Sequence, residues 1–370
     1  MARKNGIISA DSHVNPPATM YHERVPAHLK ERAPRVESRG DHEVLVFEGR
    51  EQRFGGLDSA AGTKFDKVKL QQQKAKSERA GGWDPHARIP DMDRDGVDAE
   101  VLFGSGAGGG VTIATDDREM KFGLMQAYND WIKDFCAPYP DRLIGVAEIP
   151  HWDMDLAVAE TKRARKGGLR GVLMPAVPAM VGSPESDKPY TDPWYEPLWD
   201  TLEDLEMSLN FHLGPRPVTR GLETHLMIGI SCNKSMMSEP MTSLIFSGVL
   251  MRHPKLKAVS VESGIGWMAF LLPWMDHVWE RHRYHTGSTL EEPPSFYWHR
   301  QILGTFIDDV VGVKNRDVIG VENIMWSSDY PHINSSWPNS QQYIDNHFKG
   351  VAEDEKRKMV SENVANLYKM

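Results

Sequence analysis

The chain has 370 residues, 40% of them hydrophobic and 26% charged, a globular mixture that excludes collagen-like, fully disordered and disulfide-scaffold proteins. Its 43 Lys and Arg against 52 Asp and Glu give a net charge of −9, which argues against nucleic acid as a main partner. Only two cysteines are present, Cys136 and Cys232, so a bound metal would need His and carboxylate ligands.

Eight short strand-like runs follow one another along the chain, and helical patterns separate the later ones. A doubly wound sheet would also alternate in this way, but no G-x-G-x-x-G follows a strand. We therefore predict an α/β fold, a TIM-like (β/α)8 barrel, with residues 1–370 as a single barrel domain. The predicted strands are Gly6–Ala10, Ala99–Phe103, Leu143–Ile149, Gly171–Met174, Met207–Phe211, Leu256–Val261, Gly304–Ile307 and Asn323–Ser327.

The helical patterns carry start and stop signals. A cap region, Thr115-Asp116-Asp117, precedes the first of them, and Gly167-Gly168 ends the second. The predicted helices are Arg118–Phe135, Asp155–Lys166, Pro193–Glu206, Pro240–Met251, Trp267–Tyr284 and Ala352–Lys369.

A large insertion, residues 22–88, separates the first two predicted strands. It contains a hairpin signal, Glu43–Phe47 followed by Gln52–Phe54. Loops that follow barrel strands emerge on the catalytic face, so we predict that this segment forms a lid or a dimer contact.

The first apolar run, Ile7–Ala10, is too short for a signal peptide and is followed at once by Asp11. No run approaches the ~18 apolar residues of a transmembrane helix. We expect a cytoplasmic protein with reduced thiols and no membrane partner.

Metal-binding side chains stand at four predicted strand ends: Asp11 and His13, His212, Glu262 and Asp329. Alternation along a strand points Asp11 and His13 to one side, and all the strand ends of a barrel meet at one mouth. Each residue alone is as well explained by a helix cap or a structural histidine. Together they predict a site for Zn²⁺, Mn²⁺ or Fe²⁺, with one or two ions per chain.

These motifs resemble the amidohydrolase superfamily, in the branch that includes aminocarboxymuconate-semialdehyde decarboxylase and related metal-dependent hydrolases. The resemblance covers most of the chain beyond the insertion. It rests on DSHV (Asp11–Val14), DPHARIPDMDRDGVDAEVLF (Asp84–Phe103), YNDWIKDFCAPYPDRLIGVAEIP (Tyr128–Pro150), FHLG (Phe211–Gly214), HPKLKAVSVESGIGW (His253–Trp267), SSDYPH (Ser327–His332) and NVANLY (Asn363–Tyr368).

The resemblance implies a barrel with a metal at its mouth and a homodimer. Asp11 and His13 match the strand-one pair, His212 the strand-five ligand, and Asp329 the strand-eight carboxylate, which binds metal or handles the proton of metal-bound water. Glu262 departs from the family decarboxylases, which carry His at the end of strand six. It could be a further ligand, could bridge two ions, or could act as general base. Strand four offers no Lys to bridge two metals.

Three further residues are candidates for binding the substrate. Arg216 follows His212 closely and could hold an anionic group, while His225 and His332 lie in the loops after strands five and eight.

The leading hypothesis is a metal-dependent hydrolase acting on a small organic acid derivative. The metal would activate water against an ester, thioester, amide or activated C–C bond, with Asp329 or Glu262 as proton carrier and His212 at the metal. The alternative is a non-oxidative decarboxylase of an aromatic or muconate-like acid. A third interpretation is a non-catalytic metal-binding protein.

Overall fold

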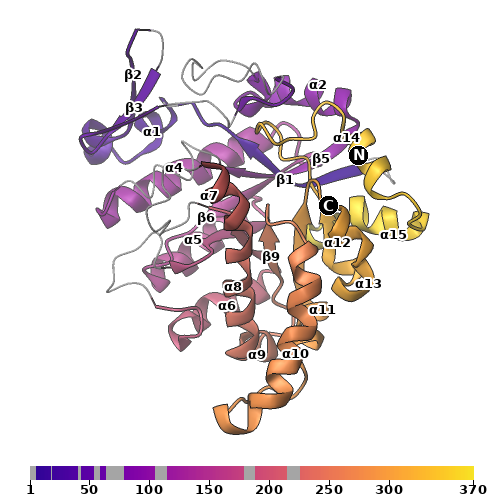
Figure 1. Ribbon diagram of the computed structural model, residues 1–370. Coiled ribbons are helices and arrows are strands. Elements are labelled where there is room, and N and C mark those ends of the chain that lie inside the picture. The colour runs from indigo at the N-terminus through magenta and orange to yellow at the C-terminus, as the bar shows by residue number, and fades with distance from the viewer. Residues whose placement is uncertain are drawn as a thin grey trace.

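Eight parallel strands form one sheet at the centre of the molecule, as predicted (Figure 1). The computed structural model describes residues 6–17, 19–40, 43–53, 59–63, 79–104, 115–178, 188–214 and 226–370. Each strand pairs with the next one along the chain, which is the topology of a nearly closed TIM barrel. The strands are β1 (Ile7–Val14), β5 (Val97–Gly104), β6 (Leu143–Glu148), β7 (Gly171–Pro175), β8 (Ser208–His212), β9 (Ala258–Val261), β10 (Ile302–Phe306) and β11 (Ile324–Trp326).

The barrel interior is filled by side chains from alternate positions of the strands, such as Ile144 and Val146 of β6. The C-terminal helix α16 (Asn363–Tyr368) adds Val364 and Tyr368 to this inner core. The Tyr368 hydroxyl donates a hydrogen bond to Asn210 Oδ1 at 2.7 Å. The interior is therefore a packed core, and chemistry is confined to one end of the barrel.

Helices surround the strands and bury a second, larger core between helices and sheet (Figure 1). They are α1 (Thr19–Arg24), α2 (Pro85–Asp95), α4 (Arg118–Cys136), α5 (Met154–Lys166), α6 (Glu196–Asp204), α7 (Leu226–Asn233), α8 (Ser238–Phe246), α9 (Val249–Arg252), α10 (Gly266–Thr286), α11 (Pro294–Gln301), α12 (Val310–Lys314), α13 (Arg316–Ile319), α14 (Ser340–His347), α15 (Glu353–Arg357) and α16.

The predicted helices are present, but the helix expected over Pro240–Met251 is wrong as a single element. Gly248 adopts φ 76°, a left-handed conformation that ends α8 and separates it from α9. The helix expected over Ala352–Lys369 contains a π-helical turn, Lys358–Glu362, between α15 and α16.

The described part of the insertion contains α1 and a small antiparallel sheet of β2 (Arg35–Ser38), β3 (Glu43–Phe47) and β4 (Arg50–Arg53). The predicted hairpin is confirmed, whereas β2 was not predicted. The sheet stands at the upper left of Figure 1, beside α1. The assignment of the insertion as lid or dimer contact stays a prediction.

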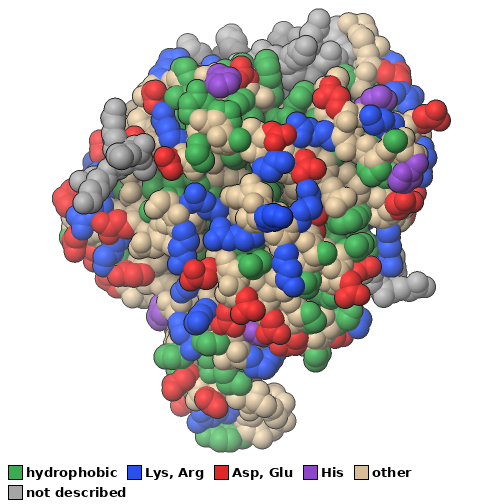
Figure 2. Space-filling view, turned by 180° about the vertical axis from the view of Figure 1, so that it is seen from behind, with side chains coloured by type: hydrophobic (Ala, Val, Ile, Leu, Met, Phe, Trp, Pro, Cys, Tyr) green, Lys and Arg blue, Asp and Glu red, His purple; other side chains and the backbone are tan. Residues whose placement is uncertain are grey.

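Charged side chains of both signs lie on the face seen in Figure 2. Figure 2 shows Lys and Arg side chains near the middle of the back face, with Asp and Glu side chains around them. Among the described residues, no helix is both long and apolar enough to cross a membrane.

Candidate metal centre

Asp11 and His13, two side chains of the kind that bind metals, lie within β1. The predicted strand ended at Ala10, before both of them. A bulge between Ser9 and Ser12 precedes His13, yet Asp11 and His13 still converge, with His13 Nε2 3.5 Å from Asp11 Oδ1. His212, the last residue of β8, places Nε2 3.4 Å from the same Asp11 oxygen. The predicted convergence of these three residues is confirmed.

Two carboxylates follow β9 and β11 in strained backbone positions. Glu262 has φ 57° and Asp329 has φ 59°, the left-handed region that non-glycine residues rarely occupy. The Glu262 N–H donates to Thr305 Oγ1 at 2.8 Å, and the Asp329 N–H donates to the Asp11 carbonyl at 3.0 Å. These bonds aim the carboxylates inward: Glu262 Oε2 lies 3.5 Å from His212 Nε2, and Asp329 Oδ1 lies 3.3 Å from His13 Nε2.

His332 joins the same cluster. Its Nδ1 lies 3.0 Å from Asp329 Oδ1, and its ring stacks on that of His13 with a centroid distance of 3.8 Å. The sequence proposed it only as a substrate contact. The other two predicted substrate contacts, Arg216 and His225, lie outside the described residues.

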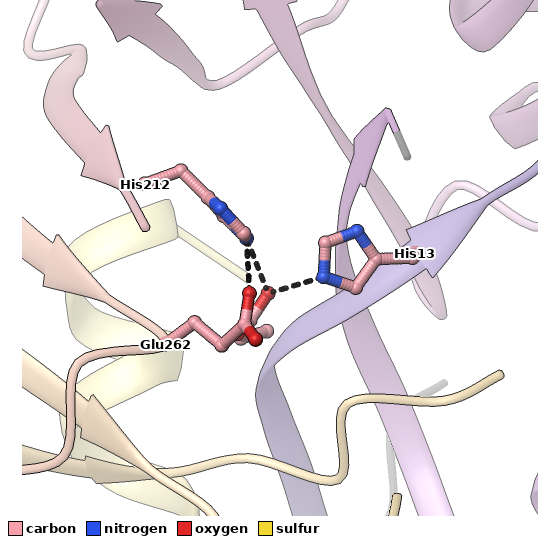
Figure 3. Close-up of side chains that lie close together, drawn as sticks. His13, His212 and Glu262 are labelled. Atoms are coloured by element: carbon pink, nitrogen blue, oxygen red, sulfur yellow. Dashed lines mark ion pairs between the residues drawn. The ribbon is translucent and has the colours of Figure 1, made fainter. Parts of the chain in front are cut away.

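The cluster fits a divalent cation. Two overlapping groups each bring four ligand atoms within 4.8 Å of one another, and both contain His13 and Glu262. Figure 3 shows the side chains of His13, His212 and Glu262 directed toward one another. One group adds Asp11 and His212, and the other adds Asp329 and His332. Within the described part of the chain, both oxygens of Asp11 and of Asp329 and both nitrogens of His13 are buried without a hydrogen-bond partner. Buried polar atoms normally have partners, so these point to a ligand.

The tautomer of His212 also suits metal binding. Its Nδ1 lies 2.7 Å from the Leu213 carbonyl, which can only accept a hydrogen bond. The proton of a neutral ring therefore sits on Nδ1, and the Nε2 lone pair faces the cluster, as in many metal-ligating histidines.

The pKa values of the side chains in the cluster are shifted in different directions. Burial and the neighbouring His332 lower the pKa of His13 to about 4, so the ring is neutral at pH 7. Burial would lower the pKa of His212 as well, but Asp11 and Glu262 outweigh it and raise that pKa to about 9. Burial and the charge of Asp329 raise the pKa of Glu262 to about 8. For Asp329, His332 and His13 outweigh burial and lower the pKa.

Accessibility shows from which side a substrate would meet the cluster. The side chains of Asp11 and Asp329 are 0% exposed and that of His13 is 2% exposed. The side chains of His212, Glu262 and His332 are 13%, 18% and 17% exposed. Asp11, His13 and Asp329 therefore form the floor of the site, and the other three line its open side.

A further buried carboxyl, that of Glu148, lies at the end of β6 and was not predicted as a site residue. Its side chain is 4% exposed, and neither oxygen has a hydrogen-bond partner among the described residues. Burial raises the pKa of Glu148 to about 8. The alternation with Ile144 and Val146, which point into the barrel, is the sequence signal that could have identified it.

Glu148 should make stability depend on pH. Its pKa rises from 4.5 to about 8 on folding, so the folded state holds this proton when the unfolded state has lost it. The stabilisation is complete below pH 4.5 and is lost as pH rises through about 8, at roughly 1 kcal/mol per pH unit in between. The free energy of unfolding, measured with urea, should therefore fall less between pH 6 and pH 9 in Glu148→Gln than in the wild type.

The exposed Glu291, between α10 and α11, provides the control for this experiment. Glu291→Gln should keep the wild-type pH dependence, and the comparison cancels contributions from the metal cluster. Equal pH dependence in Glu148→Gln and the wild type would contradict the prediction.

The chain is similar to known proteins in sequence and in structure. The amidohydrolase family model matches residues 10–370. Gamma-resorcylate decarboxylase of Rhizobium sp. (strain MTP-10005) is 24% identical over 306 residues, which cover 76% of this chain and 86% of the relative. The 2-amino-3-carboxymuconate-6-semialdehyde decarboxylase of Dictyostelium discoideum is 23% identical over 251 residues, 67% of each chain.

Solved structures share the fold. An amidohydrolase from Mycobacterium avium subsp. paratuberculosis K-10 superposes with a TM-score of 0.79 at 20% identity, over 99% of this chain and 100% of the other. The 5-carboxyvanillate decarboxylase of Sphingomonas paucimobilis gives 0.70 at 21% identity, over 99% and 100%. A dihydroxybenzoic acid decarboxylase from Polaromonas sp. JS666, with bound manganese and 2-nitroresorcinol, gives 0.69 at 19% identity, over 99% and 97%.

Proposed function

The chain belongs to the amidohydrolase family, and we propose that it is a metal-dependent, non-oxidative decarboxylase of an aromatic carboxylic acid. The observation that carries the proposal is the cluster of three histidines and three carboxylates with orphaned ligand atoms at the end of the barrel. Four of the five proteins named above are decarboxylases, of resorcylate, carboxyvanillate, a dihydroxybenzoic acid and a carboxymuconate semialdehyde. They support the decarboxylase alternative better than the hydrolase that led the sequence-based hypotheses.

Asp11, His13, His212 and Asp329, which the resemblance marks as ligands, would hold the metal. Glu262 belongs to both groups of four ligand atoms and His332 to one of them, so both are in reach. A divalent cation there would act as a Lewis acid that holds the carboxylate of the substrate and an adjacent hydroxyl. We propose Mn²⁺, because oxygen and imidazole ligands suit it and the Polaromonas decarboxylase contains it.

Decarboxylation breaks the bond between the ring carbon and the carboxylate carbon. The electron pair stays on the ring carbon, which needs a proton, and carbon dioxide leaves. Glu262 is the most exposed carboxyl of the cluster, and it enters from the open side. We assign Glu262 as the group that delivers this proton.

His332 and His212 line the same open side and frame the space that the substrate would enter. Asp329 holds the His332 ring by its contact at Nδ1, and the His13 ring supports it from one face. Arg216 and His225 remain proposed substrate contacts.

A hydrolase is the second candidate, because of one specific residue. Glu262 stands where the decarboxylases that the sequence resembles carry histidine. A carboxylate at this position could take a proton from water instead of giving one to carbon.

The test is carbon dioxide release by the manganese-loaded protein from a panel of aromatic acids. We expect turnover of acids with a hydroxyl beside the carboxylate, such as gamma-resorcylate, and none of benzoate, because the paired oxygens are what the metal would hold. His13→Ala should be inactive on the whole panel. Cleavage of esters or thioesters without carbon dioxide release would favour the hydrolase instead.

A further inference from the structure

Arg88 is the last residue of the insertion and lies on α2, behind the metal cluster. Its side chain is 0% exposed, and it forms an ion pair through Nε with Glu100 of β5, whose side chain is 2% exposed. A fully buried arginine is rare unless all its donors are engaged. The donors of Arg88 are directed at the two chain segments that carry His13 and Asp329.

The guanidinium reaches across from β1 to the segment after β11. One terminal nitrogen donates to the His13 carbonyl at 2.7 Å and to the Gly81 carbonyl at 3.1 Å. The other donates to the carbonyl of Tyr330, the residue after Asp329, at 3.4 Å. The guanidinium also lies 4.8 Å from the centroid of the Tyr330 ring.

Glu100 extends the connection to the residues before the two ligands. It accepts a hydrogen bond from Ser12 Oγ at 3.2 Å, and Ser12 Oγ lies 3.0 Å from Ser328 Oγ. Ser12 precedes His13, and Ser328 precedes Asp329. The Arg88–Glu100 pair therefore contacts the His13 segment at Ser12 and at the His13 carbonyl, and the Asp329 segment at the Tyr330 carbonyl. Ser12 extends the connection to Ser328.

Arg88 and Glu100 thus connect β1 to the segment after β11, at the place where the described strands form no ladder. Within the described residues, the paired strands run from β1 to β11, and no ladder joins these two. Isolated backbone bonds connect them, such as that from the His13 N–H to the Tyr330 carbonyl at 2.6 Å. Elsewhere in the barrel, the hydrogen bonds of the ladder fix the distance between neighbouring strands. Between β1 and β11, other groups must fix that distance.

We propose that Arg88 is a positioning residue that fixes the separation of His13 and Asp329 and thereby the affinity of the cluster for Mn²⁺. The inference rests on the proposed function for the identity of the metal. Lysine cannot replace Arg88, because a single ammonium lacks the planar fork that reaches three carbonyls and a carboxylate at once. The insertion thus contributes to the site by holding its ligands in place.

The experiment is a Mn²⁺ titration of the metal-depleted protein, followed by the electron paramagnetic resonance signal of free Mn²⁺. Arg88→Lys should weaken Mn²⁺ binding by about tenfold or more, as changes in groups that orient metal ligands do. The matched control is Arg142→Lys. Like Arg88, Arg142 bonds to backbone carbonyls and a carboxylate, here the carbonyls of Asp98 and Val97 and the carboxylate of Asp93, but at the amino end of β5. It should leave Mn²⁺ binding unchanged.

Thermal unfolding separates positioning from general stability. If Arg88→Lys and Arg142→Lys lowered the unfolding temperature alike and both kept wild-type Mn²⁺ affinity, Arg88 would be structural only. Should Arg88→Lys fail to fold, Ser12→Ala cuts the same connection more gently and should weaken Mn²⁺ binding severalfold; unchanged binding would overturn the proposal. The titration needs no turnover, so absence of carbon dioxide release would count against the proposed function and not against this inference.

Discussion

Glu262→Gln is expected to lower kcat for carbon dioxide release by about a thousandfold, within the range for loss of a positioned proton donor. Glutamine keeps the size of the side chain, but its amide has no acidic proton to deliver. The backbone strain is the same for both residues, since neither has a special preference for φ 57°. The fold should therefore be retained, and the loss should appear in kcat.

Steady-state kinetics with metal analysis distinguishes the roles that Glu262 could have. A proton donor predicts low kcat with wild-type metal content, whereas a required ligand predicts loss of metal as well. Glu291→Gln, in an exposed position after α10, is the control and should behave as wild type. A kcat of Glu262→Gln within tenfold of the wild-type value would contradict the assignment.

Removal of divalent ions should abolish turnover and lower the unfolding temperature. Without a cation, Asp11, Asp329 and Glu262 bring three carboxyl groups together at a buried site, and several of their oxygens lack partners. Added Mn²⁺ should restore activity. It should also stabilise the fold by about 2.7 kcal/mol when its concentration is 100 times Kd, because it binds only the folded state.

Two histidine variants test whether stabilisation of the fold by Mn²⁺ depends on the cluster. His212→Ala removes a ligand-type nitrogen and should abolish the rise in unfolding temperature with Mn²⁺. His277→Ala changes an exposed histidine of α10 and should keep that rise. A chelated protein with full activity and unchanged stability would show that the cluster is not a metal centre.

Much of the barrel could be predicted from sequence because its strands are short apolar runs, and the convergence of Asp11, His13, His212, Glu262 and Asp329 follows from their places at strand ends. The features that were missed, among them a place for His332 in the cluster beyond its predicted role as a substrate contact, depend on backbone geometry and packing that the residue pattern does not specify. Gly248 reads as an ordinary helix residue until its left-handed φ is known. His332 joins the cluster only because the chain turns back after Asp329, where its N–H donates to the Asp329 carbonyl at 2.9 Å.

Arg88 shows the same difficulty more strongly. In sequence it is one basic residue in a polar stretch, and nothing in the local pattern indicates that it is buried. Its role depends on α2 packing against β5 and on the open seam between β1 and β11. A substrate pocket is harder still to predict, because the loops that shape it carry little periodic pattern.

The most direct test of the central claim is turnover of gamma-resorcylate by the manganese-loaded enzyme in deuterium oxide, with products identified by mass spectrometry. Decarboxylation predicts carbon dioxide and resorcinol with one solvent deuterium at the carbon that carried the carboxylate. A product that keeps its carboxylate, or one that gains an oxygen atom from water without carbon dioxide release, would contradict it.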